Sequence, residues 1–278
     1  MPPAPPARTL LLPRRRWLLG LAASGLAPAA TACTPIRLPV APGGLLVREE
    51  QGQAQGVPVT LGQALQRRLH CPVSTELMPQ QRLIKAFYED FEADVLIPGL
   101  PQPFGDHSPH FVPLFKVAAH LVAASARRWR NQDVPALLDR GGRVVLPLHV
   151  TYGPGYDALA QRLEAQARLT WVRDVGTALR MVTAQRVEFT LLSPTVAYAN
   201  VGAAGYRGYR FLPLTQLEPL ETGAAVSQRS LPADTQARVV AALRAMAKEG
   251  DVAEAFARHF PPEVLEMERP AVLSTLRR

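Results

Sequence analysis

The chain has 278 residues, of which 47% are hydrophobic and 19% charged, and its formal net charge is +8. This composition is that of a globular protein with enough apolar side chains for one large domain or two lobes, and it excludes an intrinsically disordered chain. The basic residues are mostly scattered arginines, and their one dense run, residues 126–131, is typical of a solvated turn, so we expect no nucleic-acid partner.

Residues 1–32 form a predicted export signal. Three arginines, Arg14 to Arg16, precede an apolar stretch from Trp17 to Leu26, and small residues follow just before Cys33. The apolar stretch is too short for a permanent membrane span. The run of arginines is similar to a twin-arginine (Tat) export motif, and general (Sec) secretion is the alternative. Without this segment the chain carries 27 basic and 23 acidic residues, a net charge of +4.

Cys33 has two interpretations. The sequence "ATAC" resembles a lipobox, in which the cysteine would be lipidated. In the second interpretation, the small residues before Cys33 form an ordinary A-x-A signal-peptidase cleavage site. The other cysteine, Cys71, also stands just before a predicted strand. If the two strands are parallel neighbours, a Cys33–Cys71 disulfide is geometrically feasible in an oxidising compartment. Lipidation of Cys33 and this disulfide exclude each other.

The first half of the chain alternates predicted strands and helices. Residues 35–42 form a strand, 52–59 a turn, and 60–70 a helix with Thr60 as its N-cap. A second strand covers residues 71–78, a second helix begins at Pro79 and runs to 91, and a buried strand covers 93–97. This order is a βαβαβ unit.

The second half repeats the unit. A strand over residues 115–125 leaves the first unit, and strands at 143–150, 169–175 and 188–193 alternate with helices at 153–167 and 176–187. Another strand at 220–230 and a helical pair at 232–260 follow. We therefore predict an α/β fold with mostly parallel sheets in two lobes, joined by strands because no flexible linker separates them.

In open α/β sheets the binding crevice lies beyond the carboxyl ends of the strands. The loops predicted there span residues 42–46, 78–82, 98–106, 151–155, 175–177 and 193–196. The loop at 98–106 supplies Gly99 and Leu100 as candidate ligand contacts. Thr151, Tyr152 and Gly153 stand before Pro154 at a predicted helix start, where free N–H groups would attract an anion. A simple strand-to-helix turn explains the same residues.

Four stretches of the chain resemble motifs of one protein family. They are "IRLPVAPGGLLVREEQGQAQGVPVTLGQAL", "QRLIKAFYEDFEADVLI", "TALRMVTAQRVEF" and "ALRAMAKEGDVAEAFARHF". In this order they are similar to family 3 of the periplasmic solute-binding proteins of ABC importers, the polar amino-acid-binding type, over residues 36–262. The resemblance implies a type 2 periplasmic-binding-protein-like fold. Its lobes would be residues 33–119 plus 215–278 and residues 120–214, with hinge crossings near 118–124 and 212–224.

The ligand clamp of that family is missing. Counted along the resembling motifs, the arginine that binds the α-carboxylate falls on Asp106, and the aspartate that holds the α-ammonium falls on Ser193. An aspartate would repel a carboxylate, so a free α-amino acid is a poor candidate ligand. Arg82, near the end of the second strand, could replace the missing arginine, although a helix-surface role explains it as well.

The sequence offers candidate residues for a metal site and for an enzyme active site. Asp106, His107 and His110 carry metal-ligand chemistry, but no other Cys/His pair has metal-ligand spacing, so we expect rim histidines, no metal and no cofactor. A cyclohexadienyl-dehydratase-like activity would need a cleft carboxylate, for which Asp106 and Glu76 are the candidates. The sequence favours a binding protein over an enzyme.

The sequence therefore predicts an exported, monomeric, periplasmic protein, with a lipid anchor if Cys33 is lipidated. It would capture a small solute other than an amino acid between its lobes and pass it to a membrane permease of an ABC-type importer. The alternative is a periplasmic sensory or accessory protein that signals to a membrane partner.

Overall fold

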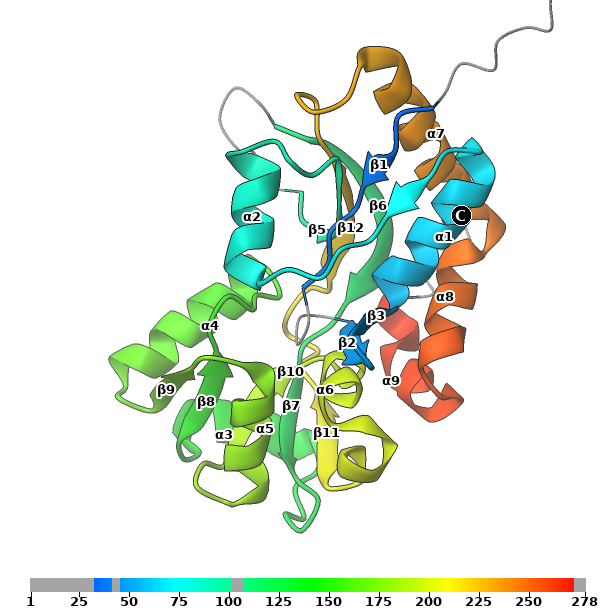
Figure 1. The fold of residues 1–278 in the computed structure, drawn as a ribbon. Coiled ribbons are helices and arrows are strands. Elements are labelled where there is room, and N and C mark those ends of the chain that lie inside the picture. The colour runs from blue at the N-terminus through cyan, green and yellow to red at the C-terminus, as the bar shows by residue number, and fades with distance from the viewer. Residues whose placement is uncertain (1–32, 42–45, 102–107, 273–278) are drawn as a thin grey trace, which may run out of the picture. The chain divides into compact units, whose positions relative to one another are not determined.

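The computed structural model describes residues 33–41, 46–101 and 108–272 (Figure 1). The predicted export signal, residues 42–45 and the loop section that contains Asp106 and His107 lie outside the described residues. Among the described residues, no helix is both long and apolar enough to cross a membrane.

The first sheet has three antiparallel strands in the order β5 (Val95–Gly99), β12 (Leu220–Val226) and β6 (His110–Val117). A parallel pair, β1 (Ile36–Arg37) and β4 (Val73–Ser74), continues this layer. The backbone N–H of Asp94 donates to the carbonyl of Arg37 at 2.9 Å, and the buried Asp94 carboxylate pairs with the Arg37 guanidinium at 2.7 Å. These bonds hold β1 against the start of β5.

Helices cover both faces of this layer because neighbouring residues of each strand alternate between two cores. Val95 and Ile97 pack with α1 (Val57–Leu69), α7 (Ala233–Glu249) and α8 (Asp251–His259). Leu96 packs on the opposite face with α2 (Gln80–Tyr88). A hairpin of β2 (Val47–Glu50) and β3 (Gln53–Gly56) precedes α1.

The second sheet has five strands in the order β11 (Tyr209–Pro213), β7 (His120–Ala124), β10 (Phe189–Leu192), β8 (Val144–Pro147) and β9 (Leu169–Val172). Its two faces also carry separate apolar cores. One core includes residues of α3 (Val134–Arg140) and α4 (Pro154–Ala165), and the other face packs against α5 (Val175–Thr183) and α6 (Pro194–Tyr206).

The chain crosses twice between the two sheets, as the predicted fold class requires. It leaves β6 for β7 through residues 118–119 and returns from β11 to β12 through residues 214–219. The two passages run in opposite directions, so β6 pairs antiparallel with β12 and β7 antiparallel with β11. The expectation of mostly parallel sheets therefore holds for β1–β4 and β10–β8–β9. It is wrong for the strands at the crossings.

Three local predictions need correction. Helix α1 begins at Val57 with Gly56 as its N-cap, rather than after Thr60, and Pro58 suits its first turn. The predicted turn at residues 52–59 contains strand β3, and the single strand predicted at residues 115–125 is the end of β6 followed by β7. Helix α6, strand β11 and the last helix, α9 (Pro262–Val272), were not predicted.

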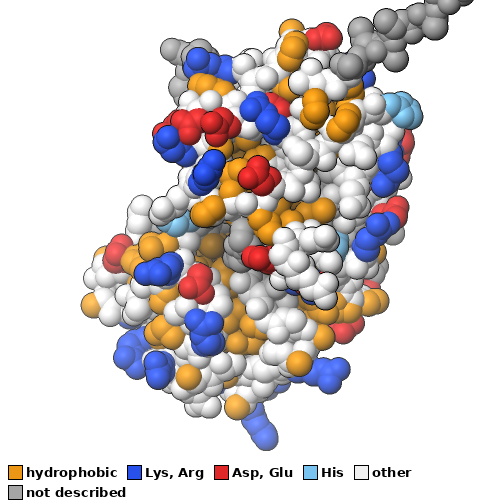
Figure 2. Space-filling view, viewed as in Figure 1, with side chains coloured by type: hydrophobic (Ala, Val, Ile, Leu, Met, Phe, Trp, Pro, Cys, Tyr) orange, Lys and Arg blue, Asp and Glu red, His pale blue; other side chains and the backbone are white. Residues whose placement is uncertain are grey.

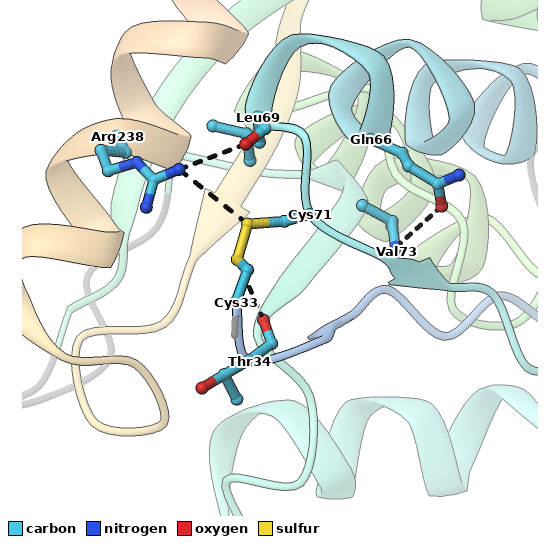
Figure 3. Close-up of a disulfide and its surroundings, with 7 residues drawn as sticks. All are labelled: Cys33, Thr34, Gln66, Leu69, Cys71, Val73 and Arg238. Atoms are coloured by element: carbon cyan, nitrogen blue, oxygen red, sulfur yellow. Dashed lines mark hydrogen bonds between the residues drawn. A yellow bond between two sulfur atoms is a disulfide. The ribbon is translucent and has the colours of Figure 1, made fainter. Parts of the chain in front are cut away.

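Cys33 and Cys71 form a disulfide, with their Cα atoms 5.5 Å apart (Figure 3). It joins the residues just before β1 and β4, which are paired in parallel as the sequence suggested. The guanidinium of Arg238 on α7 lies 3.9 Å from the sulfur of Cys71 and donates a hydrogen bond to the carbonyl of Leu69. The disulfide thus ties the first strand of the described chain to the α1–β4 connection beside α7.

Candidate functional site

A cavity of about 380 Å³ lies between the two sheets, close to both crossings. The three-stranded sheet and α2 form one wall, and the segment after β8 together with the β9–α5 loop forms the other. Figure 2 shows hydrophobic side chains on both sides of the hollow between these elements. Most lining residues are apolar: Ala41, Leu46, Val47, Leu83, Ile84, Leu96, Ile97, Pro98, Leu100, Phe115, Val117, Pro147, Leu148, Val150, Val175, Val196 and Leu220.

Two of these apolar side chains are open to solvent. Ile84 on α2 is 40% exposed and Leu148, just after β8, is 44% exposed. Among the described residues, the third large hydrophobic side chain with comparable exposure is Trp171, which lies outside the cavity. Exposed aliphatic side chains on both walls of one cavity mark a surface that gains stability when something apolar covers it.

At the start of α4, polar groups of the cavity wall already hydrogen-bond to one another. The backbone N–H of Gly153 donates to Thr151 Oγ1 at 3.0 Å, and the Thr151 hydroxyl donates to the Asp157 carboxylate at 2.8 Å. A carboxylate in the first turn of α4 already complements the positive end of that helix. The Gly153 N–H is therefore already used within the protein, and an anion site at this helix start stays a prediction.

Tyr152 connects the cavity to a buried polar network. Its hydroxyl oxygen accepts a hydrogen bond from the backbone N–H of Ser193 at 2.7 Å, and burial raises its pKa. The Ser193 hydroxyl caps α6 and lies 3.1 Å from the Thr195 hydroxyl. Thr195 in turn donates to Glu268 on α9 at 3.0 Å. The network therefore runs from the cavity wall, through the start of α6, to the last helix.

Glu268 and His120 are buried titratable groups near the first crossing. Burial raises the pKa of Glu268 to about 7, and hydrogen bonds from Thr195 only partly oppose the shift. Burial lowers the pKa of His120 to about 4, and its Nδ1–H donates to the carbonyl of Ala118 at 3.2 Å. Both side chains are therefore expected to be largely uncharged near pH 6.5.

The described residues that line the cavity include two charged side chains, Arg173 and Asp174, both in the β9–α5 loop. Asp174 caps α5: one carboxylate oxygen accepts from the Thr177 N–H at 2.7 Å and the other from the Thr177 hydroxyl at 2.9 Å. Arg173 is exposed and makes no hydrogen bond or ion pair with another described residue. Among the described lining residues it is therefore the cation whose N–H donors are left for a bound molecule.

The structure brings together only some of the sequence-predicted site residues. Leu100, Thr151 and Tyr152 line the cavity. The remaining described candidates do not line it: Arg82, Gly99, Gly153 and Ser193. Arg82 is exposed on α2, and Gly99 lies so close to β12 that a Cβ atom there would stand 2.8 Å from the backbone nitrogen of Ala225. Asp106 lies outside the described residues.

The cavity residues that were missed from the sequence include Arg173, Ile84 and Leu148. Arg173 lies inside the strand predicted at residues 169–175, but it precedes an Asp-x-x-Thr capping pattern, which signals that the strand ends before it. Ile84 and Leu148 carry no local signal because each fits an ordinary apolar position of a helix or a strand.

No protein-family model matches the chain. No curated protein matches it in sequence either.

Solved structures do match the fold. The arginine-, lysine-, histidine-binding protein ArtJ from Geobacillus stearothermophilus has a TM-score of 0.64 at 14% identity, over 84% of this chain and 100% of that chain. A histidine kinase sensor domain with similarity to periplasmic binding proteins has a TM-score of 0.62 at 19% identity, over 82% and 97%. An ancestral amino acid-binding protein, a precursor of cyclohexadienyl dehydratase, has a TM-score of 0.61 at 16% identity, over 82% and 95%. At these identities the likeness confirms the expected fold, that of periplasmic binding proteins.

Proposed function

We propose that this chain is an exported solute-binding protein that captures a small solute other than an amino acid between two lobes and presents it to a membrane partner. The observation that carries the proposal is the cavity of about 380 Å³, whose walls come from both sheets and whose position is next to both crossings. Its volume falls in the range of small-molecule sites. A solute that touches both walls would favour the closed arrangement of the lobes.

The lobes of this proposal are residues 33–119 plus 215–278 and residues 120–214. The described strands divide in this way: β1–β6 and β12 belong to the first group, and β7–β11 belong to the second. Export through the signal in residues 1–32 is part of the same proposal, and a disulfide between Cys33 and Cys71 fits an oxidising compartment such as the periplasm. We expect the mature protein to be a monomer.

An amino acid is not the proposed solute, because the cavity offers a better partner to its carboxylate than to its ammonium group. Arg173 has no partner among the described residues, but the oxygens of Asp174 already cap α5. Arg82 does not line the cavity. An ammonium group would have to share the Asp174 carboxylate with Thr177, and against the apolar wall it would lose hydrogen bonds that it makes in water.

Delivery to the permease of an ABC-type importer is the first choice of role. The sensory alternative is supported by the histidine kinase sensor domain that shares the fold. Affinity purification from membranes discriminates between them: an importer would yield a permease, and a sensor would yield a kinase or a cyclase. An enzymatic role has less support, because the one carboxylate among the described lining residues is the helix cap Asp174.

Native mass spectrometry of the purified protein, compared with the denatured chain, tests solute binding. We expect a small-molecule adduct that Leu148→Glu abolishes, because the new carboxylate would enter the apolar cavity. Trp171→Glu is the matched control, since Trp171 is similarly exposed but lies outside the cavity, and it should keep the adduct. In thermal-shift assays the common amino acids should leave the melting temperature unchanged. Stabilisation by several degrees with any of them would contradict the proposed solute class.

A further inference from the structure

We infer that the solute has an apolar body and a single anionic group, and that Arg173 pairs with this group; a small monocarboxylate is the simplest such molecule. The inference rests on the proposed solute-binding function and names the chemical class of the ligand. The family's arginine clamp is missing here, because its position falls on Asp106, and an arginine in the β9–α5 loop would take over its role.

The apolar body follows from the two walls. Ile84 and Leu148 remain 40% and 44% exposed, although each belongs to the lining of the cavity. Leu83, Leu96, Phe115 and Val150 extend the same apolar surface. A ligand that covers these side chains gains stability roughly in proportion to the apolar area that it removes from water. A strongly polar solute such as a sugar would leave the hydroxyl groups that face these apolar side chains without partners.

The single anionic group follows from the charges. The guanidinium of Arg173 has five N–H donors that match a carboxylate, and no other described residue uses them. The neighbouring Asp174 would attract a cation, but both its oxygens already accept hydrogen bonds from Thr177. Asp174 keeps its negative charge within the α5 cap, so the charged group that has no partner among the described residues at the cavity is the Arg173 guanidinium, and it lies beside an apolar wall. This combination suits an amphiphilic anion better than a zwitterion.

The experiment compares matched ligands by isothermal titration calorimetry with the full mature chain. Phenylacetate and octanoate are the proposed class, phenylacetamide and octanamide are their neutral counterparts, and phenylalanine and norleucine are zwitterions with similar apolar bodies. We expect each carboxylate to bind at least about tenfold more tightly than its amide, since hydrogen bonds to charged groups are about twice as strong as neutral ones. Each zwitterion should bind no better than the amide.

Arg173→Gln should reduce the preference for carboxylate over amide to about twofold or less, because the remaining amide group donates neutral hydrogen bonds. Arg180→Gln is the control: it removes the same charge from α5, where the side chain bonds to Thr177 Oγ1 outside the cavity. Ile84→Ser should weaken carboxylates and amides alike, whereas Trp171→Ser should change neither.

The outcomes separate the two proposals. If amides bind as tightly as carboxylates, or if Arg173→Gln keeps the preference, the ligand class is wrong and solute binding stands. If the zwitterions bind most tightly, the missing-clamp argument is wrong as well. If no probe binds and the purified protein carries no adduct in native mass spectrometry, solute binding itself is overturned.

Discussion

At the scale of single residues, Glu268 and His120 affect stability in opposite directions as the pH changes. The folded-state pKa of Glu268 is about 7, above its ordinary value of 4.5, so the folded protein keeps a proton that the unfolded chain has lost. Its contribution to stability is therefore lost as the pH rises from about 4.5 through about 7. The pKa of His120 is lowered from 6.5 to about 4, so its contribution is lost as the pH falls through that range.

We predict that the two effects partly cancel in the wild-type protein between pH 5 and pH 7. Each shift corresponds to roughly 3–4 kcal/mol at about 1.4 kcal/mol per pKa unit. In Glu268→Gln the free energy of unfolding should fall more steeply on acidification than in the wild type, because the opposing carboxyl group is gone, and in His120→Gln it should fall less or rise. His259, whose pKa is also lowered by burial, contributes in the same way to all three proteins. Denaturant unfolding at pH 5, 6, 7 and 8 measures both slopes.

Tyr152 and Tyr206 do not disturb this comparison, because burial raises the pKa of each and keeps both neutral over the same range. Identical pH profiles in the wild type and both variants would show that neither buried group titrates as described.

At the scale of elements, the disulfide fastens β1 to the connection between α1 and β4. Cys33 and Cys71 are separated by 38 residues in the sequence. A cross-link that closes a loop of this length stabilises the folded state by about 4 kcal/mol in the chain-entropy description. The link supports the pairing of β1 with β4, and β1 in turn hydrogen-bonds to Asp94 at the start of β5.

We therefore predict that Cys71→Ser lowers the free energy of unfolding by about 2–4 kcal/mol. Cys33→Ser should have the same effect, and the double variant should be no less stable than either single variant. Denaturant unfolding with and without a reductant checks this, and the reductant should not change the double variant. If mass spectrometry finds a lipid on Cys33 of the mature protein, Cys71→Ser should cost little, and the disulfide assignment would fail.

At the scale of the whole molecule, the two crossings are the connections about which a bound solute could draw the two lobes together. The antiparallel pairs β6–β12 and β7–β11 carry the chain between the sheets, and the cavity opens beside them. The network from Tyr152 to Glu268 also joins the cavity wall to α9. Because a ligand can shift an equilibrium only by its different affinity for the two states, a solute must touch both walls to favour closure.

We predict that saturating octanoate reduces the radius of gyration of the mature chain in small-angle X-ray scattering, because it bridges Ile84 and Leu148 on opposite walls. Leu148→Glu should abolish the change, and Trp171→Glu should leave it intact. A radius of gyration that stays constant while calorimetry shows binding would mean that the cavity binds without closing.

Much of this protein is determined by its sequence alone. Alternation of apolar strands and amphipathic helices predicts the α/β class, because the periods of two and about 3.6 residues follow from backbone geometry. Cys33 and Cys71, each just before a predicted strand, made the disulfide feasible, and the parallel pairing of β1 with β4 decides for it over the lipidation alternative. Leu100, Thr151 and Tyr152 were found because loops at the carboxyl ends of strands line the crevice in this architecture.

Only the tertiary structure decides the rest. The antiparallel pairing of β6 with β12 depends on the direction of two passages that lie about a hundred residues apart, which no local pattern records. Arg173, Ile84 and Leu148 meet at one cavity although each has an ordinary local role. Ser193 faces a buried network instead of the cavity. Which side chains face a cavity is set by the packing of distant elements, and that packing is a property of the whole fold.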